Sequence, residues 1–487
     1  MGGIKARRSE DAGNDRQTWF ERRSRTLASA IKLPASYAGL GLLSGWLGWE
    51  LGALRDVGIG YAVPLVSPKL FFDYGEILGG IVCLLLLSRT KKLSSNGALA
   101  LLSTACMFGG SLFVMLANGA AIAPPSWLML FVALASGVGY IVQFLLWLEV
   151  LGFVSPVSTM LAYSVAYLIS SCLWFCTQSM ALEATNTLAL LLPLGSLLFF
   201  AAASGRKDAP SCADMESPGR PSVTRIIVWV WIFAFAYGVG GEFTKMSYST
   251  AAAKLGVFVA ALIIALGIVL ASKRLDYSVF YRLSFVFMAF GFVVSLVVDN
   301  PALMQACMSA SNALVTILAV TFACGAAYFR RRSSLTILAP TFVGWYVASL
   351  VGKNFASVLL QAWNVPVSAE ITIASLLIIV LFLVALFWFR EIDFLTYWQT
   401  AVKKSPGVPP DEGSPEKFEN LSKREMNILT LIAAGRSQAE IAQELFIAPG
   451  TVRAHVNHIY TKLDVHSKEE LQDLLKRDSS ESEPFDS

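Results

Sequence analysis

The sequence predicts an all-α protein with a twelve-helix transmembrane bundle, in two halves of six, and a small C-terminal domain of four helices. Hydrophobic residues make up 55% of its 487 residues and charged residues only 15%, against less than a half and about a quarter in soluble chains. The hydrophobic residues gather in runs of about 20, the length of a helix that crosses a bilayer. Only the two ends of the chain and a central loop are markedly polar. This composition excludes an ordinary soluble enzyme.

The first 33 residues are a basic arm with six arginines between Arg7 and Arg25. No cleavable targeting segment is expected, because the hydrophobic run that follows is too long for the core of a signal peptide. Twelve hydrophobic runs come next, separated by prolines, glycines and charged residues. They cover approximately residues 34–54, 70–88, 97–117, 126–150, 156–178, 184–203, 225–244, 250–272, 278–298, 302–326, 334–360 and 369–389.

A polar loop with three prolines, residues 204–224, divides the runs into a first half, 34–203, and a second half, 225–390. Lysine and arginine resist translocation, so short loops rich in them are expected on the cytoplasmic side. They gather after even-numbered runs, at Arg89, Lys91, Lys92, Arg206, Lys207, Arg220, Lys273, Arg274, Arg330, Arg331 and Arg332. Both chain ends are therefore expected in the cytoplasm.

Twelve spans split six and six by a cytoplasmic loop resemble the major facilitator fold, in which two six-helix halves enclose a site at mid-membrane. The resemblance is one of architecture and covers residues 34–390. The family's charged loop after span 2, G-x-x-x-D-R-x-G-R-R, is absent from this sequence, which has SRTKKLSSNG there. Since that loop takes part in gating in transporters of the family, its absence weighs against transport.

Charged side chains inside membrane spans are costly and usually face a cavity or a partner. Under the inferred topology six of them lie toward the outer ends of their spans: Glu50, Asp73, Glu76, Glu242, Lys254 and Lys353. With Trp46, Trp49, Tyr237 and Trp345 as aromatic walls, they predict an externally open pocket for a small molecule. An alternative of equal weight is that these charges lie at the membrane interface, or pair with one another and lock the halves together.

A proline- and glycine-rich linker, residues 391–420, separates the bundle from the small domain, 421–477. The acidic tail, 478–487, is expected to be disordered. Three capping boxes predict helix starts in the domain, in which Ser422, Ser437 and Ser467 are followed three positions later by Glu425, Glu440 and Glu470. A longer helix is predicted from Pro449 to Leu463, with Val452, Val456, Ile459 and Leu463 facing the core.

The domain resembles the LuxR-type helix-turn-helix in five short motifs. These are L-S-x-R-E from Leu421, G-x-S from Gly435, E-I-A from Glu440, T-V-R-x-H from Thr451 and I-Y-x-K-L-x-V from Ile459. The resemblance implies that the long helix enters the major groove of double-stranded promoter DNA. It implies that Arg453, Ala454 and Asn457 read bases, and that Thr451, His455 and Lys462 lie near phosphates.

The domain holds eight basic against seven acidic residues, so a single copy is expected to bind DNA weakly. A homodimer is expected, because in the family the fourth helix, here around Leu471, supplies a dimer contact. His455 and His458 are spaced three apart on the long helix, but the nearest third histidine, His466, lies beyond that helix. No metal and no cofactor are therefore expected.

These observations lead to a functional hypothesis. The chain is predicted to be a one-component transcription regulator in the bacterial inner membrane, whose bundle senses an unidentified small molecule and whose cytoplasmic domain binds DNA. The alternative is a secondary transporter of the major facilitator type with a regulatory tail that binds DNA or protein. No nucleophile, metal cluster or phosphate-binding loop indicates an enzyme.

Overall fold

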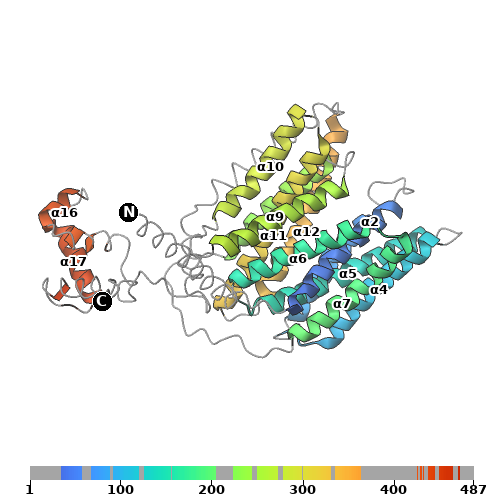
Figure 1. Ribbon diagram of the computed structural model, residues 1–487, viewed down its shortest axis with the longest axis horizontal. Helices are drawn as coiled ribbons and strands as arrows, with labels where there is room; N and C mark the ends of the chain where they lie inside the picture. Colours follow the sequence, from blue (N-terminus) through green and yellow to red (C-terminus); the bar gives the residue numbers. More distant parts are fainter. Residues whose placement is uncertain are drawn as a thin grey trace, which may run out of the picture. The chain divides into compact units, whose positions relative to one another are not determined.

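The computed structural model divides the chain into two compact units, Met1–Gly407 and Val408–Ser487. In the first it describes residues 35–57, 67–87, 92–119, 125–154, 156–204, 223–243, 249–271, 278–298, 300–330 and 335–363. In the second it describes 425, 428–429, 431–432, 437–444, 449–463, 465 and 470–471. Every regular element in these ranges is a helix (Figure 1), which confirms the all-α prediction.

Eleven α-helices follow the first eleven predicted spans closely. The first half contains the short 3-10 helix η1 (Ala35–Tyr37), α2 (Ala38–Val57), α3 (Pro68–Leu87), α4 (Gly97–Gly119), α5 (Ser126–Leu151), α6 (Pro156–Thr177) and α7 (Leu182–Ser204). The second half contains α8 (Val223–Phe243), α9 (Thr250–Ala271), α10 (Ser278–Val298), α11 (Pro301–Arg330) and α12 (Leu335–Trp363). The twelfth predicted span, 369–389, lies outside the described residues.

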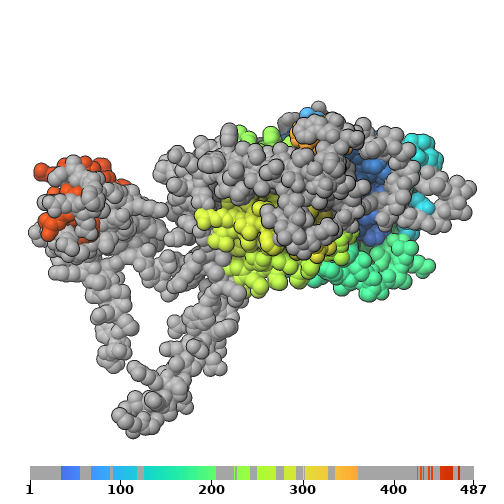
Figure 2. Space-filling model, turned by 90° about the horizontal axis from the view of Figure 1, so that it is seen from above, coloured from blue at the N-terminus to red at the C-terminus, as the bar shows by residue number. Residues whose placement is uncertain are grey.

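Eight of these helices are long and apolar enough to cross a membrane: α3 to α7, α9, α11 and α12. Two more, α8 and α10, contain shorter apolar stretches, Ile227–Gly241 and Val279–Gly291. The surface of the bundle, of which Figure 2 shows one face, contains described parts of both halves. It exposes large apolar side chains such as Leu101, Phe131, Leu198 and Val358, as expected of a surface that faces lipid tails.

Local signals in the sequence set the helix starts. Proline occupies the first position of α3, α6 and α11, where its missing N–H would have had no helical partner. The side chains of Ser67, Asn96, Ser249 and Asn300 accept hydrogen bonds from backbone N–H groups three residues later. Such caps satisfy amides that the helix itself leaves unpaired.

The helix pairs of the two halves correspond when each span is matched with the span six positions later. Within the halves, α3 packs on α5 as α9 packs on α11, α2 on α6 as α8 on α12, and α4 on α5 as α10 on α11. Between the halves, α6 packs on α9 and the matched helix α12 packs on α3, while α11 also packs on α6. Five described helices of each half therefore show an internal twofold repeat.

Glycines allow matched helices to approach at backbone distance. A Cβ added at Gly75 of α3 would meet the Leu134 carbonyl oxygen of α5, and one added at Gly256 of α9 would meet the Ala306 carbonyl oxygen of α11. Small residues at such crossings are the usual means of close packing between membrane helices.

The C-terminal unit has a hydrophobic core of its own. Its described helices are α16 (Gln438–Glu444) and α17 (Pro449–Leu463) (Figure 1). The four α17 residues predicted to face the core are all buried, together with Ile428, Leu429, Ile432, Ile441, Ala442, Val465 and Leu471. The predicted cap at Ser437 is confirmed, because Ser437 N donates to Glu440 Oε2 at 2.7 Å and Glu440 N donates to Ser437 Oγ at 3.3 Å. Ser422 and Ser467 lie outside the described residues.

Candidate functional site

One face of α17 is packed and the other is exposed to solvent. Thr451, Arg453, Ala454 and Asn457, four of the residues predicted to contact DNA, are exposed, while His455 is half-buried. The buried stripe from Val452 to Leu463 holds the helix against the rest of the domain. The helix therefore presents the predicted DNA-contacting residues on a surface free of the domain's own core.

Lys462, the sixth predicted DNA-contacting residue, is tied to an earlier part of the domain. Its Nζ donates to Glu425 Oε2 at 2.7 Å, and its side chain keeps 39% exposure. Glu425 is almost completely buried, and its Oε1 lies 3.9 Å from His458 Nδ1. This ion pair fixes the end of α17 against the helical turn at residue 425.

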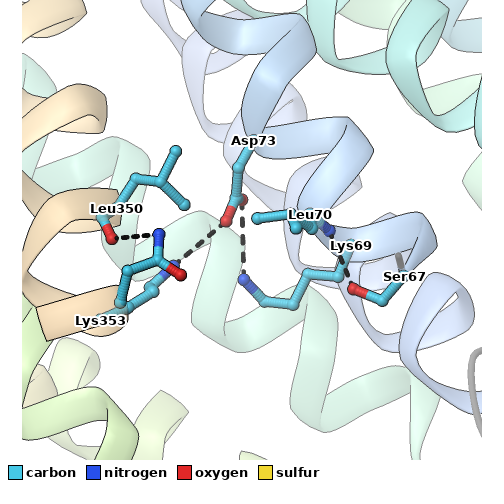
Figure 3. Close-up of polar contacts among 7 residues, drawn as sticks. Ser67, Lys69, Leu70, Asp73, Leu350 and Lys353 are labelled. Atoms are coloured by element: carbon cyan, nitrogen blue, oxygen red, sulfur yellow. Dashed lines mark hydrogen bonds and ion pairs between the residues drawn. The ribbon is translucent and has the colours of Figure 1, made fainter. Parts of the chain in front are cut away.

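In the bundle, charged side chains join the two halves. Lys353 Nζ of α12 lies 3.1 Å from Asp73 Oδ2 of α3, and Lys69 Nζ of α3 lies 3.6 Å from Asp73 Oδ1. Figure 3 shows Asp73 between the two lysines. On α12 the Asn354 side-chain amide donates to the Leu350 carbonyl oxygen one turn earlier. This is the pairing of halves that the sequence left as an alternative to a ligand pocket.

Glu76 lies one turn after Asp73 on α3 and is 4% exposed. It lies beside Tyr346 of α12, which also neighbours Tyr140 of α5. Tyr163 and Tyr167 of α6 continue this polar path toward Thr316 of α11. Five helices from both halves thus contribute to one buried network of a carboxyl and several hydroxyl groups.

The sequence analysis missed the tyrosines of this network. Tyrosine inside a hydrophobic run looks like an ordinary membrane residue, so Tyr140 and Tyr346 gave no signal on their own. The spacing of Tyr163 and Tyr167, one helical turn apart, is the pattern that would have marked a polar stripe on α6.

Glu50 and Trp46, one turn apart on α2, belong to a second polar cluster inside the first half. Trp46 Nε1 donates to Ser111 Oγ at 2.7 Å, and Ser111 Oγ donates to Glu50 Oε2 at 3.0 Å. Glu50 Oε1 and the neighbouring Ser136 Oγ make no hydrogen bond among the described residues. Trp46 stacks on Tyr140 with ring centroids 6.2 Å apart, so this cluster adjoins the tyrosine network.

The structure differs from an externally open pocket at these residues. Trp46 and Glu50 are both 0% exposed. The physical reason is the small size of the facing residues on α4 and α5, because a Cβ added at Gly110 would meet Ser136 Oγ and approach Glu50 Oε1 to 3.4 Å. The helices therefore close around the carboxyl group.

The remaining predicted pocket residues have other neighbours. Lys254 of α9 reaches Gly48 of α2, where an added Cβ would meet its Nζ. Trp345 stacks on Phe233 within the second half at 6.0 Å, and Trp49 and Tyr237 are partly buried against the core. The side chain of Glu242 lies outside the described residues.

Comparison with known proteins identifies the small domain. Residues 419–475 match the family described as "Bacterial regulatory proteins, luxR family". The Oxygen regulatory protein NreC of Staphylococcus haemolyticus (strain JCSC1435) is 51% identical over 61 residues, which are 12% of this chain and 28% of that protein. NreC of Staphylococcus aureus (strain JH9) is 54% identical over 56 residues, 12% of this chain and 26% of that protein. The match spans about a quarter of these relatives.

The bundle has counterparts among solved structures of transporters. The human organic anion transporter MFSD10 (TETRAN) gives a TM-score of 0.49 at 16% identity, covering 72% of this chain and all of that one. FucP, a Major Facilitator Superfamily transporter in the outward conformation, gives 0.45 at 14% identity, with 74% of this chain covered and all of that one. The chain thus joins a LuxR-type helix-turn-helix domain to a multi-pass helical bundle.

Proposed function

We propose that this protein is a membrane-embedded one-component transcription regulator, in which the bundle senses a small molecule and the C-terminal domain binds promoter DNA. The observation that carries the proposal is the exposed row of Thr451, Arg453, Ala454 and Asn457 on a helix whose other face is buried. This row occurs in a chain that also has eight helices able to span a membrane. A groove-reading helix needs such a free face.

Direct signalling between the two parts is supported by the length of the linker. The residues between 390 and 421 are too few for a separate phosphoacceptor domain of typical size. Oxygen regulation, the role named for the staphylococcal relatives, is not transferred to this chain, because the match is confined to the DNA-binding segment. The signal is instead assigned to a molecule bound by the bundle.

The ligand site is placed at the network around Glu76, Tyr140 and Tyr346, next to Asp73 and Lys353. These groups come from both halves, so a molecule that binds them contacts both. A ligand shifts a conformational equilibrium only by its difference in affinity between the states. A site shared by two halves provides that difference whenever the halves move relative to one another.

The test of DNA binding uses Arg453. We expect Arg453→Ala to abolish promoter control in cells while the protein reaches the membrane in normal amounts. Arg453→Lys, which keeps the charge but loses the planar guanidinium, should restore non-specific DNA binding but not control, since lysine does not replace a bidentate contact. Promoter control that is unchanged in Arg453→Ala would refute the assignment.

The transporter alternative is favoured by one observation, the ion pair of Asp73 and Lys353 between the halves, since alternating access moves one half against the other. Deletion of residues 421–477 separates the two functions. Uptake of a substrate by the truncated chain, together with no protected promoter DNA for the full chain, would establish the transporter. Loss of gene control without any uptake would establish the regulator.

A further inference from the structure

Three side chains with metal-binding atoms meet on the C-terminal domain. One ligand atom each from Glu425, His455 and His458 lies within 4.8 Å of the others. The two histidines, three positions apart on α17, share one face of the helix. Glu425 comes from a helical turn 30 positions before His455. This distance along the chain is why the sequence offered no third ligand.

The carboxyl group of Glu425 is already oriented toward the histidines. Its Oε2 accepts a hydrogen bond from Lys462 Nζ at 2.7 Å, while its Oε1 lies 3.9 Å from His458 Nδ1. The group is held on one side and faces the imidazole on the other. Lys462 therefore acts like the outer hydrogen-bonding partners that orient ligands in metal sites.

Side-chain rotations would bring the three atoms, which lie within 4.8 Å of one another, to coordination distance. Zinc binds histidine nitrogen and carboxylate oxygen at about 2.0–2.2 Å, and tetrahedral ligands at that distance lie about 3.4 Å from one another. The 3.9 Å contact must shorten by roughly half an ångström by this measure. The His458 side chain is 68% exposed and so has room to rotate.

We propose that Glu425, His455 and His458 form a binding site for a divalent transition-metal ion, with Zn²⁺ as the expected ion. Two imidazoles favour zinc, copper, nickel or iron over calcium or magnesium, which require oxygen ligands. Three protein ligands leave a fourth position for water. Because both histidines lie on α17, the bound charge would sit on the helix that is proposed to read DNA.

The experiment uses the full chain in detergent, stripped of metal with a chelator and titrated with Zn²⁺ against a colorimetric chelator. We expect one ion per chain at this site. His455→Ala, His458→Ala and Glu425→Gln should each weaken binding by about tenfold or more, as loss of a supporting partner already does in metal sites. His466→Ala is the matched control, because His466 is the remaining histidine of the chain's three, and it should leave the affinity unchanged.

Several outcomes would overturn the site. Unchanged zinc affinity in the double variant of His455 and His458 would assign the bound ion to other groups, including the cysteines. Unchanged affinity in Glu425→Gln would leave a bare histidine pair rather than the proposed site. Since Glu425 also pairs with Lys462, circular dichroism and a melting curve must show that the Glu425→Gln domain remains folded; the exposed His458 provides an independent test if it does not.

Discussion

Asp73 supplies the carboxylate of an ion pair between the two halves. It pairs with two lysines, Lys69 on its own helix and Lys353 on α12. Its side chain is 15% exposed, so its charge is largely shielded from water. Removing one member of a buried pair is costly because the remaining charge is left without compensation.

This arrangement predicts unequal effects of three substitutions. Asp73→Asn leaves two lysines facing each other and should lower stability by about 2 kcal/mol or more, whereas Lys353→Met keeps the Lys69 pair and should cost less. Lys69→Met should cost under about 1 kcal/mol, because the Lys69 side chain is 44% exposed. Thermal unfolding of the three variants in detergent measures the order of these losses of stability. Equal losses of stability would show that the ion pair between Asp73 and Lys353 contributes no more than the one between Asp73 and Lys69.

The sequence marks the charged residues of the bundle but not their uncharged partners. Asp73, Glu76 and Lys353 stand out because charges are rare in hydrophobic spans. The hydroxyl partners Tyr346 and Ser111 do not stand out, since such residues are common in membrane helices. Which charge meets which partner depends on how helices from distant parts of the chain pack, and that information is not local.

At the scale of single elements, α16 depends on its cap. It is seven residues long, too short to be stable without packing and end contacts. Ser437 and Glu440 supply the end contacts by bonding to each other's backbone N–H groups. The sequence predicted this cap directly, because both residues belong to one local motif.

Removing the cap should loosen α16 without unfolding the domain. Ser437→Ala is expected to cost about 1 kcal/mol, and Ser437→Thr, which keeps the hydroxyl, should cost much less. Hydrogen exchange at the Glu440 and Ile441 amides is the measurement, and about fivefold faster exchange corresponds to that energy. Identical exchange in both variants would mean that packing alone holds the helix.

Glycines where two helices of the bundle cross give a second prediction. Gly75→Ala and Gly256→Ala each place a methyl group against a backbone carbonyl of the partner helix, so each should destabilise the bundle by about 1–3 kcal/mol. Gly109→Ala is the control, because nothing lies within 4 Å of its added Cβ and alanine favours helix over glycine.

Unfolding midpoints in detergent test this prediction. The unfolding midpoints of Gly75→Ala and Gly256→Ala should fall by similar amounts, because the two positions lie on corresponding helices of the two halves. If Gly109→Ala were as harmful as either of them, a general intolerance of substitution would explain the losses and the crossings would not.

At the scale of the whole molecule, the sequence predicted the parts better than their internal arrangement. The number and limits of the hydrophobic runs follow from bilayer thickness, and the first eleven agree with the helices. The pairing of α3 with α12 and of α6 with α9 came only from the structure. Hydropathy is nearly uniform around such helices and does not identify the face that meets a partner.

The two units have separate hydrophobic cores, and this leads to the last prediction. The core of the bundle extends from Leu40 to Trp345, and that of the C-terminal unit from Ile428 to Leu471, with no residue in common. Stability that comes from burial depends on the residues of the same core. A chain that ends at Gly407 should therefore unfold at the same temperature as the bundle in the full chain, within about 2 °C. Scanning calorimetry in detergent should show the large transition retained and only a small one lost. A marked fall in the large transition would mean that the DNA-binding domain supports the bundle, and a ligand signal would then have a direct route from one unit to the other.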